Sequence, residues 1–189
     1  MNRSIPKIKS SFLSCEKDIE LILRKLFVEA GPYSDILKTL LIVNTKDCLD
    51  NMQDYKEVID KVSLKDIRRD YFRLEPRLEM KEHEDVKSYI LLSFDNFTPN
   101  ATNEYYRDCT ISFDIICNTE CWDLGDYRLR PVKIMGYIDG LLNNKKLTGI
   151  GVLNFIGANE LILNEDWAGY TMMFRAVHGD DDNIAGILS

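Results

Sequence analysis

The first segment of this sequence whose residue types could do chemistry carries two cysteines and a tryptophan. Residues 117–124 read CNTECWDL, with three residues between Cys117 and Cys121. Closely spaced thiolates bind zinc or do redox chemistry, and His83 and His178 could supply two further zinc ligands. Zinc sites usually carry tighter pairs, often C-x2-C, and no second pair follows here. We therefore expect no metal site.

An alternating strand offers a simpler explanation for two of these thiols. Successive side chains of a strand point to opposite faces of a sheet, so residues of one parity share a face. Cys109 and Cys117 belong to the apolar parity of this strand, and we expect them to act as small hydrophobic core residues. Cys121 is expected in a loop. The apolar parity comprises Cys109, Ile111, Phe113, Ile115 and Cys117.

Catalytic motifs give no firmer lead. The sequence contains no G-x-S-x-G, P-loop, H-E-x-x-H or G-x-G-x-x-G pattern. The adjacent carboxylates Glu165 and Asp166 could do acid–base work or hold a divalent ion, but such pairs are more typical of solvated loops. We expect no enzyme, no catalytic residue and no cofactor, with a small hydrolase using a carboxylate site as an alternative.

Composition excludes several classes of partner. The 189 residues carry a net charge of −7, which does not suit a protein that grips nucleic acid by neutralising phosphates. No apolar run approaches the roughly 18 residues of a membrane span, and the N-terminal stretch lacks the apolar core of a secretory signal. The five cysteines are expected to be free thiols in a cytosol.

Helical periodicity dominates residues 1–62. After Ser14, a candidate N-cap, apolar residues recur at positions 19, 22, 23, 26 and 27, which predicts an amphipathic helix. A second helix is predicted from Ser34 and a third from Asp54 to Val62. The segment 63–87 is dense in charge of both signs and is interpreted as a connector.

Residues 88–179 have the pattern of an α+β domain. Strands are predicted at 88–94, 106–119, 151–155, 160–163 and 170–177, and a helix runs from Tyr127 to Leu142 with Pro131 in its first turn. Residues 180–189 form an acidic tail, expected to be flexible. The predicted fold class is α+β: a mostly antiparallel β-sheet with one packed helix across it, preceded by an N-terminal helical segment.

Three stretches of this domain resemble a known class of phage protein. They are YRDCTISFDIICNT, LRPVKIMGYIDGLLNNKKLTGIGVLNF and ELILNEDWAGYTMMFRAVHG. Together they resemble the head-tail joining proteins of tailed bacteriophages, the tail-terminator and neck proteins. The resemblance implies a homo-oligomeric ring, commonly six-fold, that contacts portal or adaptor rings and the tail tube. Such a protein is made in the host bacterial cytoplasm and resides in the virion, where DNA passes through the ring without specific binding.

A ring whose contacts close by rotation needs two different patches on each subunit. We expect one patch on the strand edge around residues 170–177, with Tyr170, Met173 and Arg175, and the other near residues 124–130. In the second patch, Arg128 and Arg130 would pair with carboxylates across the interface. An acidic surface that does not bind DNA phosphates is expected from Glu165, Asp166, Asp180, Asp181 and Asp182. An intracellular adaptor that binds protein through its N-terminal helices is the alternative from another class.

Overall fold

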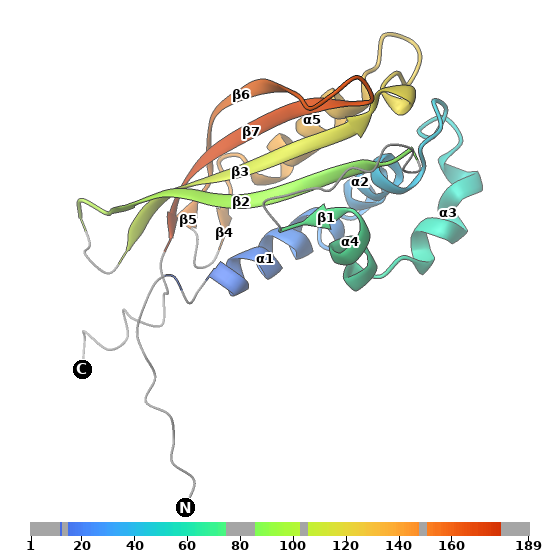
Figure 1. The fold of residues 1–189 in the computed structure, drawn as a ribbon. Coiled ribbons are helices and arrows are strands. Elements are labelled where there is room, and N and C mark those ends of the chain that lie inside the picture. Colours follow the sequence, from blue (N-terminus) through green and yellow to red (C-terminus); the bar gives the residue numbers. More distant parts are fainter. Residues whose placement is uncertain (1–11, 13–14, 75–85, 103–105, 148–150, 179–189) are drawn as a thin grey trace, which may run out of the picture.

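The computed structural model describes residues 12, 15–74, 86–102, 106–147 and 151–178, and it confirms the α+β class (Figure 1). Helices precede the sheet in the chain, and one more helix interrupts the strands. The helices are α1 (Cys15–Phe27), α2 (Pro32–Ile42), α3 (Met52–Lys61), α4 (Leu64–Asp70), α5 (Arg130–Leu142) and the 3-10 turn η2 (Thr119–Cys121). The strands are β1 (Phe72–Arg73), β2 (Ser88–Pro99), β3 (Arg107–Asn118), β4 (Lys146–Leu147), β5 (Gly151–Val152), β6 (Asn154–Ile162) and β7 (Trp167–His178).

The main sheet has five strands in the order β1-β2-β3-β7-β6, and β4 pairs with β5 separately. All neighbours in the main sheet are antiparallel except β1 and β2, which are parallel. The central strand β3 places Phe113 opposite Leu92 of β2 and Met172 of β7. The sheet is therefore mostly antiparallel, as predicted.

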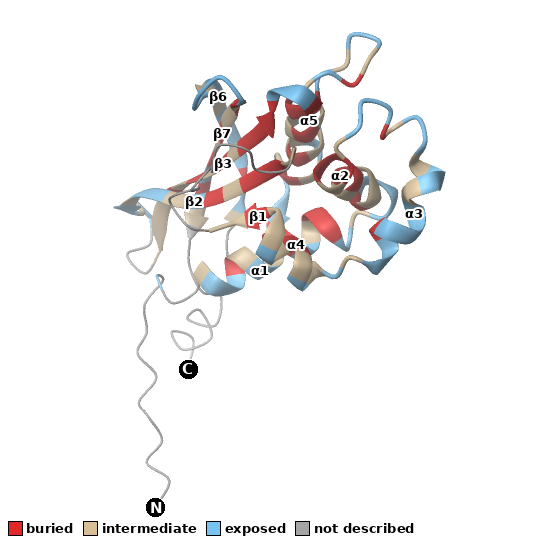
Figure 2. Ribbon diagram, turned by 45° about the vertical axis from the view of Figure 1, so that its right-hand side comes forward, coloured by how far each residue is buried: buried red, intermediate tan, exposed pale blue. Residues whose placement is uncertain are grey.

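The predicted inward face of β3 is confirmed. Its five apolar odd-numbered residues are all buried, and so are Met172, Phe174 and Ala176 of β7. Phe113 and Phe174 meet edge to face with ring centroids 5.7 Å apart. Figure 2 shows the buried residues where the strands and the helices face each other. One continuous core thus joins the N-terminal helices to the sheet.

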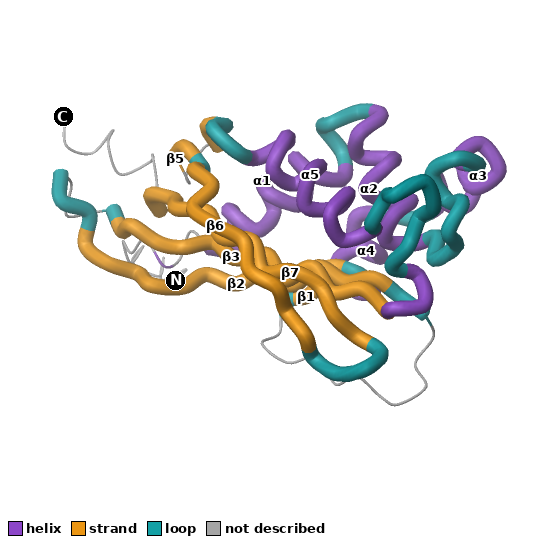
Figure 3. The backbone as a smooth tube through the Cα atoms, turned by 90° about the horizontal axis from the view of Figure 1, so that it is seen from above, coloured by secondary structure: helices purple, strands orange, loops and turns teal. Residues whose placement is uncertain are grey.

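The helices cover one face of the sheet (Figure 3). The predicted stripe of α1 is confirmed, because Ile22, Leu23, Leu26 and Phe27 are buried. Helix α5 packs against β3 and β7 and lies beside α2. It begins at Arg130 rather than at Tyr127, because residues 125–127 have positive φ angles that cannot continue a right-handed helix.

The charged segment 63–87 contains more structure than a connector. Helix α4 starts at a capping box, in which the Ser63 hydroxyl accepts from the amide of Asp66 and the Asp66 carboxylate accepts from the amide of Ser63. Strand β1 follows. The strands predicted at 151–155 and 160–163 are instead the two-residue β5 and one long strand, β6. Ser14, His83 and the tail 180–189 lie outside the described residues.

The other face of the sheet carries a small apolar cluster of its own. Ile116, which breaks the alternation of β3, packs there with Tyr89 and Trp167, and all three are buried. This cluster accounts for the exception in the sequence pattern. Within the described residues, no helix has the length and apolarity needed to cross a membrane.

Candidate functional site

Four of the five cysteines are buried, and the described residues bring no set of metal ligands together. Cys117 and Cys121 are both buried. The expectation that Cys121 lies in a loop is wrong, because it is the last residue of a short 3-10 helix. Cys121 lies in η2, where its Sγ is 3.3 Å from the Asn118 carbonyl oxygen. His178 pairs with Arg107 at the opposite end of β3 from Cys117, about 30 Å away at the usual strand rise. Among the described residues, no three His, Cys, Asp or Glu side chains could share a metal ion.

Arg130 is the largest fully buried side chain among the described residues. Its Nε donates to the Cys121 carbonyl at 2.7 Å, and its Nη1 donates to the Leu40 and Val43 carbonyls at 2.6 and 2.9 Å. Its Nη2 donates to the Thr45 carbonyl at 2.7 Å. The guanidinium therefore satisfies carbonyls at the C-terminal end of α2, where the helix dipole also favours a cation.

This burial corrects the expectation that Arg130 lies at a subunit interface. A guanidinium with no exposed surface cannot reach a carboxylate on a neighbouring subunit. The sequence did contain a signal, because Arg130 precedes Ile134, Ile138 and Leu142 at intervals of four and so belongs to the buried stripe of α5.

Arg128 lies nearer the surface and already has partners within the subunit. Its two terminal nitrogens contact the two carboxylate oxygens of Asp50 at 2.9 and 2.8 Å, in a bidentate pair. Hydrogen bonding from Arg128 lowers the pKa of Asp50, and the carboxylate raises the pKa of Arg128 in turn. The pair joins the loop before α5 to the loop between α2 and α3. The side chain of Arg128 keeps 24 % of its surface exposed.

The three residues predicted on a strand edge lie within the sheet instead. Strand β7 pairs with β3 on one side and β6 on the other, so the expected edge around residues 170–177 is occupied. Tyr170 is half-buried, with its ring 6.4 Å from that of Trp122. Met173 and Arg175 point to the sheet face away from the helices, where Arg175 is exposed. The edge strand is β6.

The acidic residues are partly placed. Glu165 and Asp166 are exposed in the turn between β6 and β7. Asp180, Asp181 and Asp182 lie outside the described residues, together with the basic N-terminal residues. The structure therefore locates one acidic turn and does not describe the acidic tail.

An exposed apolar surface, which the sequence patterns did not indicate, lies beside α5. The side chains of Tyr127, Leu129 and Val132 are respectively 105, 39 and 47 % exposed. They line a shallow depression of about 460 Å³ together with Arg128, Lys133, Gly136 and Tyr137. We call this surface the α5 depression. The dipeptide Gly125-Asp126, a typical turn signal, was the available clue that residues before α5 form a projecting loop.

A second exposed apolar surface lies along β6 and its turn. Phe155, Ile156, Ile162 and Leu163 each keep more than two fifths of their surface exposed. Within the described residues, no strand pairs with the outer edge of β6. Exposed edge strands of this length are surfaces to which other chains bind. The sequence NFIGANELI has no regular alternation, so its pattern did not identify an edge strand.

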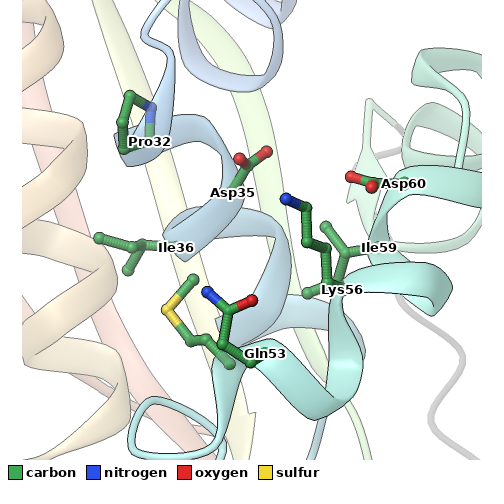
Figure 4. A pocket seen from close by; sticks show the side chains of 8 residues that line it. Pro32, Asp35, Ile36, Gln53, Lys56, Ile59 and Asp60 are labelled. Atoms are coloured by element: carbon green, nitrogen blue, oxygen red, sulfur yellow. The ribbon is translucent and has the colours of Figure 1, made fainter.

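A second hollow, of about 290 Å³, lies between α2 and α3 (Figure 4). Its lining includes the apolar side chains of Ile36, Met52 and Ile59, and its charged groups are Asp35, Lys56 and Asp60. The lining contains no His, Cys, Ser or Thr, so it lacks a side-chain nucleophile paired with a histidine base.

The comparisons with known proteins point to a phage. The model of the YomW family matches residues 34–176, from α2 through to β7. A comparison with curated proteins found no match. Because the matched segment covers well over half of the chain, the protein belongs to the YomW family, a family of the Bacillus phage SPbeta-region type, and is phage-associated.

Proposed function

We propose that this protein is a non-enzymatic structural subunit of a tailed phage particle, which assembles into a ring at the head-tail junction. The ring is a tail terminator or another neck ring, between the portal or adaptor rings and the tail tube. Membership of a phage-associated family supports the phage setting. The resemblance of the β3, α5 and β7 segments to head-tail joining proteins supports the position in the particle.

The main structural support for the proposed ring is the position of the two exposed apolar surfaces on each subunit. The α5 depression lies on the helical side of the sheet, whereas Figure 3 shows the turn between β6 and β7 on the opposite side. Surfaces on opposite sides of a subunit cannot both face the same partner. A contact between them is therefore head-to-tail, and repeated contacts of this kind close into a ring or continue as a filament.

The charge of the chain suits a passage for DNA. At −7 the subunit carries an excess of carboxylates, and a ring of six copies would repel the phosphates of a passing duplex. Asp180, Asp181 and Asp182 are the residues that we assign to the wall of this passage. DNA would pass without being held, as a junction that must release the genome requires.

The experiment that tests this function is a phage carrying an early stop codon in this gene. We expect infected cells to accumulate DNA-filled heads and separate tails, and expression of the protein from a plasmid to restore joined particles. Joined, infectious particles in the absence of the protein would overturn the proposal and favour the intracellular adaptor.

A further inference from the structure

We propose that the turn between β6 and β7 of one copy inserts into the α5 depression of the next copy. The inference rests on the proposed ring and names the two surfaces that form its repeated contact. The occupant of the depression is thus a second copy of this chain. The inserted element comprises Ile162, Leu163, Glu165 and Asp166, and we call it the β6–β7 turn.

The depression has an apolar lining and a rim that is held in an unfavourable backbone conformation. Gly125, Asp126 and Tyr127 have φ angles of 76, 48 and 63°, and the last two are not glycines. A non-glycine residue in the left-handed region is unfavourable and persists only where the surrounding structure holds it. Here the Asp123 carboxylate accepts from the Gly125 amide at 2.8 Å, and the Arg128 side chain donates to the Gly125 carbonyl at 3.2 Å.

This held loop presents the whole side chain of Tyr127 to solvent beside Leu129 and Val132. An exposed tyrosine loses little conformational entropy on binding and has a large contact area, which is why tyrosine is enriched at interfaces. Gly136 adds no side chain to the lining, and no atom lies within 4 Å of the position that a Cβ would take there. A partner side chain can therefore approach the backbone of α5 closely.

The β6–β7 turn also has a backbone conformation that is held by hydrogen bonds before any partner binds. The Asn164 side chain accepts from the amides of Asp166 and Trp167, both at 2.9 Å, and the Trp167 carbonyl accepts from Leu163. The amide of Thr119 donates to the Asp166 carbonyl at 2.8 Å, which ties the turn to η2. These bonds fix the backbone while Ile162 and Leu163 remain 68 and 45 % exposed. A rigid apolar projection of this kind binds with a small entropic cost.

Charge complementarity selects the depression as the surface that receives this turn. Lys133 lines the depression, and it forms no ion pair within the described residues, whereas Arg128 is already paired with Asp50. The turn carries two exposed carboxylates, Glu165 and Asp166, that likewise form no ion pair in the part of the chain that the structure describes. Opposite charges placed around an apolar contact fix its register. This assignment replaces the DNA-passage role expected for Glu165 and Asp166.

A charge swap tests the pairing. The first variant is Lys133→Glu, and the second combines Glu165→Lys with Asp166→Lys. Each should raise the concentration at which the purified ring dissociates by roughly tenfold or more, because like charges then meet at the contact. The variant with all three substitutions should restore assembly to near that of the parent. Lys65→Glu, on the exposed side of α4, is the matched control and should change nothing.

The readouts are the molar mass from light scattering across a dilution series and the urea denaturation curve of each variant. Unchanged denaturation curves establish that a loss of mass reflects assembly. If the parent forms a ring and the charge variants assemble equally well, this pairing is overturned while the proposed ring stands. The same conclusion follows if the triple variant does not recover the assembly of the parent. If the parent is monomeric at every concentration, the ring is overturned and the pairing with it.

Discussion

Replacement of Arg130 by methionine should nearly unfold the protein. Methionine fills much of the same volume but donates no hydrogen bond, so the buried carbonyls of Leu40, Val43 and Cys121 would lose their donor. The partly buried carbonyl of Thr45 would lose its donor as well. A buried polar group without a partner costs about 1–3 kcal/mol. The three buried carbonyls alone give an expected loss of at least about 3 kcal/mol, against a total stability of about 5–15 kcal/mol for a single domain.

The measurement is the free energy of unfolding in urea, followed by circular dichroism. Arg128→Met is the matched control two residues away, and it should lose much less because the pair with Asp50 is exposed to solvent and screened. Arg130→Lys should fall between the two, since an ammonium has three donors and cannot reach all four carbonyls. Equal losses for the Arg130 and Arg128 methionine variants would refute the assignment of Arg130 as an internal anchor.

Four further predictions concern the sheet and the helix α5 that packs against it. Burial raises the pKa of the Cys109 and Cys117 thiols to about 12 from an ordinary 9.0. Above about pH 9 the unfolded chain loses these protons before the folded chain does, so the free energy of unfolding in urea should fall as the pH rises towards 12. If the thiols are exposed, they should contribute no such fall. The same thiols should react with a thiol reagent slowly in the native protein and quickly in denaturant, and rapid native reaction would show that they lie outside the core. Phe113→Ala should cost about 3–5 kcal/mol, and a variant that melts like the parent would place Phe113 on the wrong face. Gly169→Ala should be strongly destabilising, because the new Cβ would lie 1.7 Å from a carbonyl oxygen of β3. Gly140→Ala has free space for its Cβ and should stabilise α5 by up to about 1 kcal/mol. Similar thermal midpoints for the two variants would contradict the β3–β7 register.

Local periodicity predicted the elements that the core depends on. The alternation from Cys109 to Cys117 and the stripes of α1 and α5 could be read from the sequence, because period two and period 3.6 each place apolar residues on one face. The fold class followed from their order. The capping box at Ser63 was also present in the sequence, but the surrounding charges concealed the short helix α4.

Local periodicity did not predict which strand forms the edge of the sheet, nor that Arg130 is buried. Strand order depends on which strands pair with each other, and the alternation of apolar residues in β7 is the same whether or not β6 pairs with it. From its residue type alone, Arg130 is expected at the surface. It is buried because its guanidinium binds the C-terminal end of α2, a contact between positions about 90 residues apart. The α5 depression is lined by residues 127–137 alone, and its loop depends on the positive φ angles of Asp126 and Tyr127, which side-chain periodicity does not predict.

The most direct test of the ring at the head-tail junction is a cryo-electron microscopy reconstruction of the neck of purified particles. The density between portal and tail tube should contain a closed ring into whose repeated unit this α+β subunit fits, with one sheet and α5 per repeat. Particles that lack the protein, or that carry it at another position, would contradict the account.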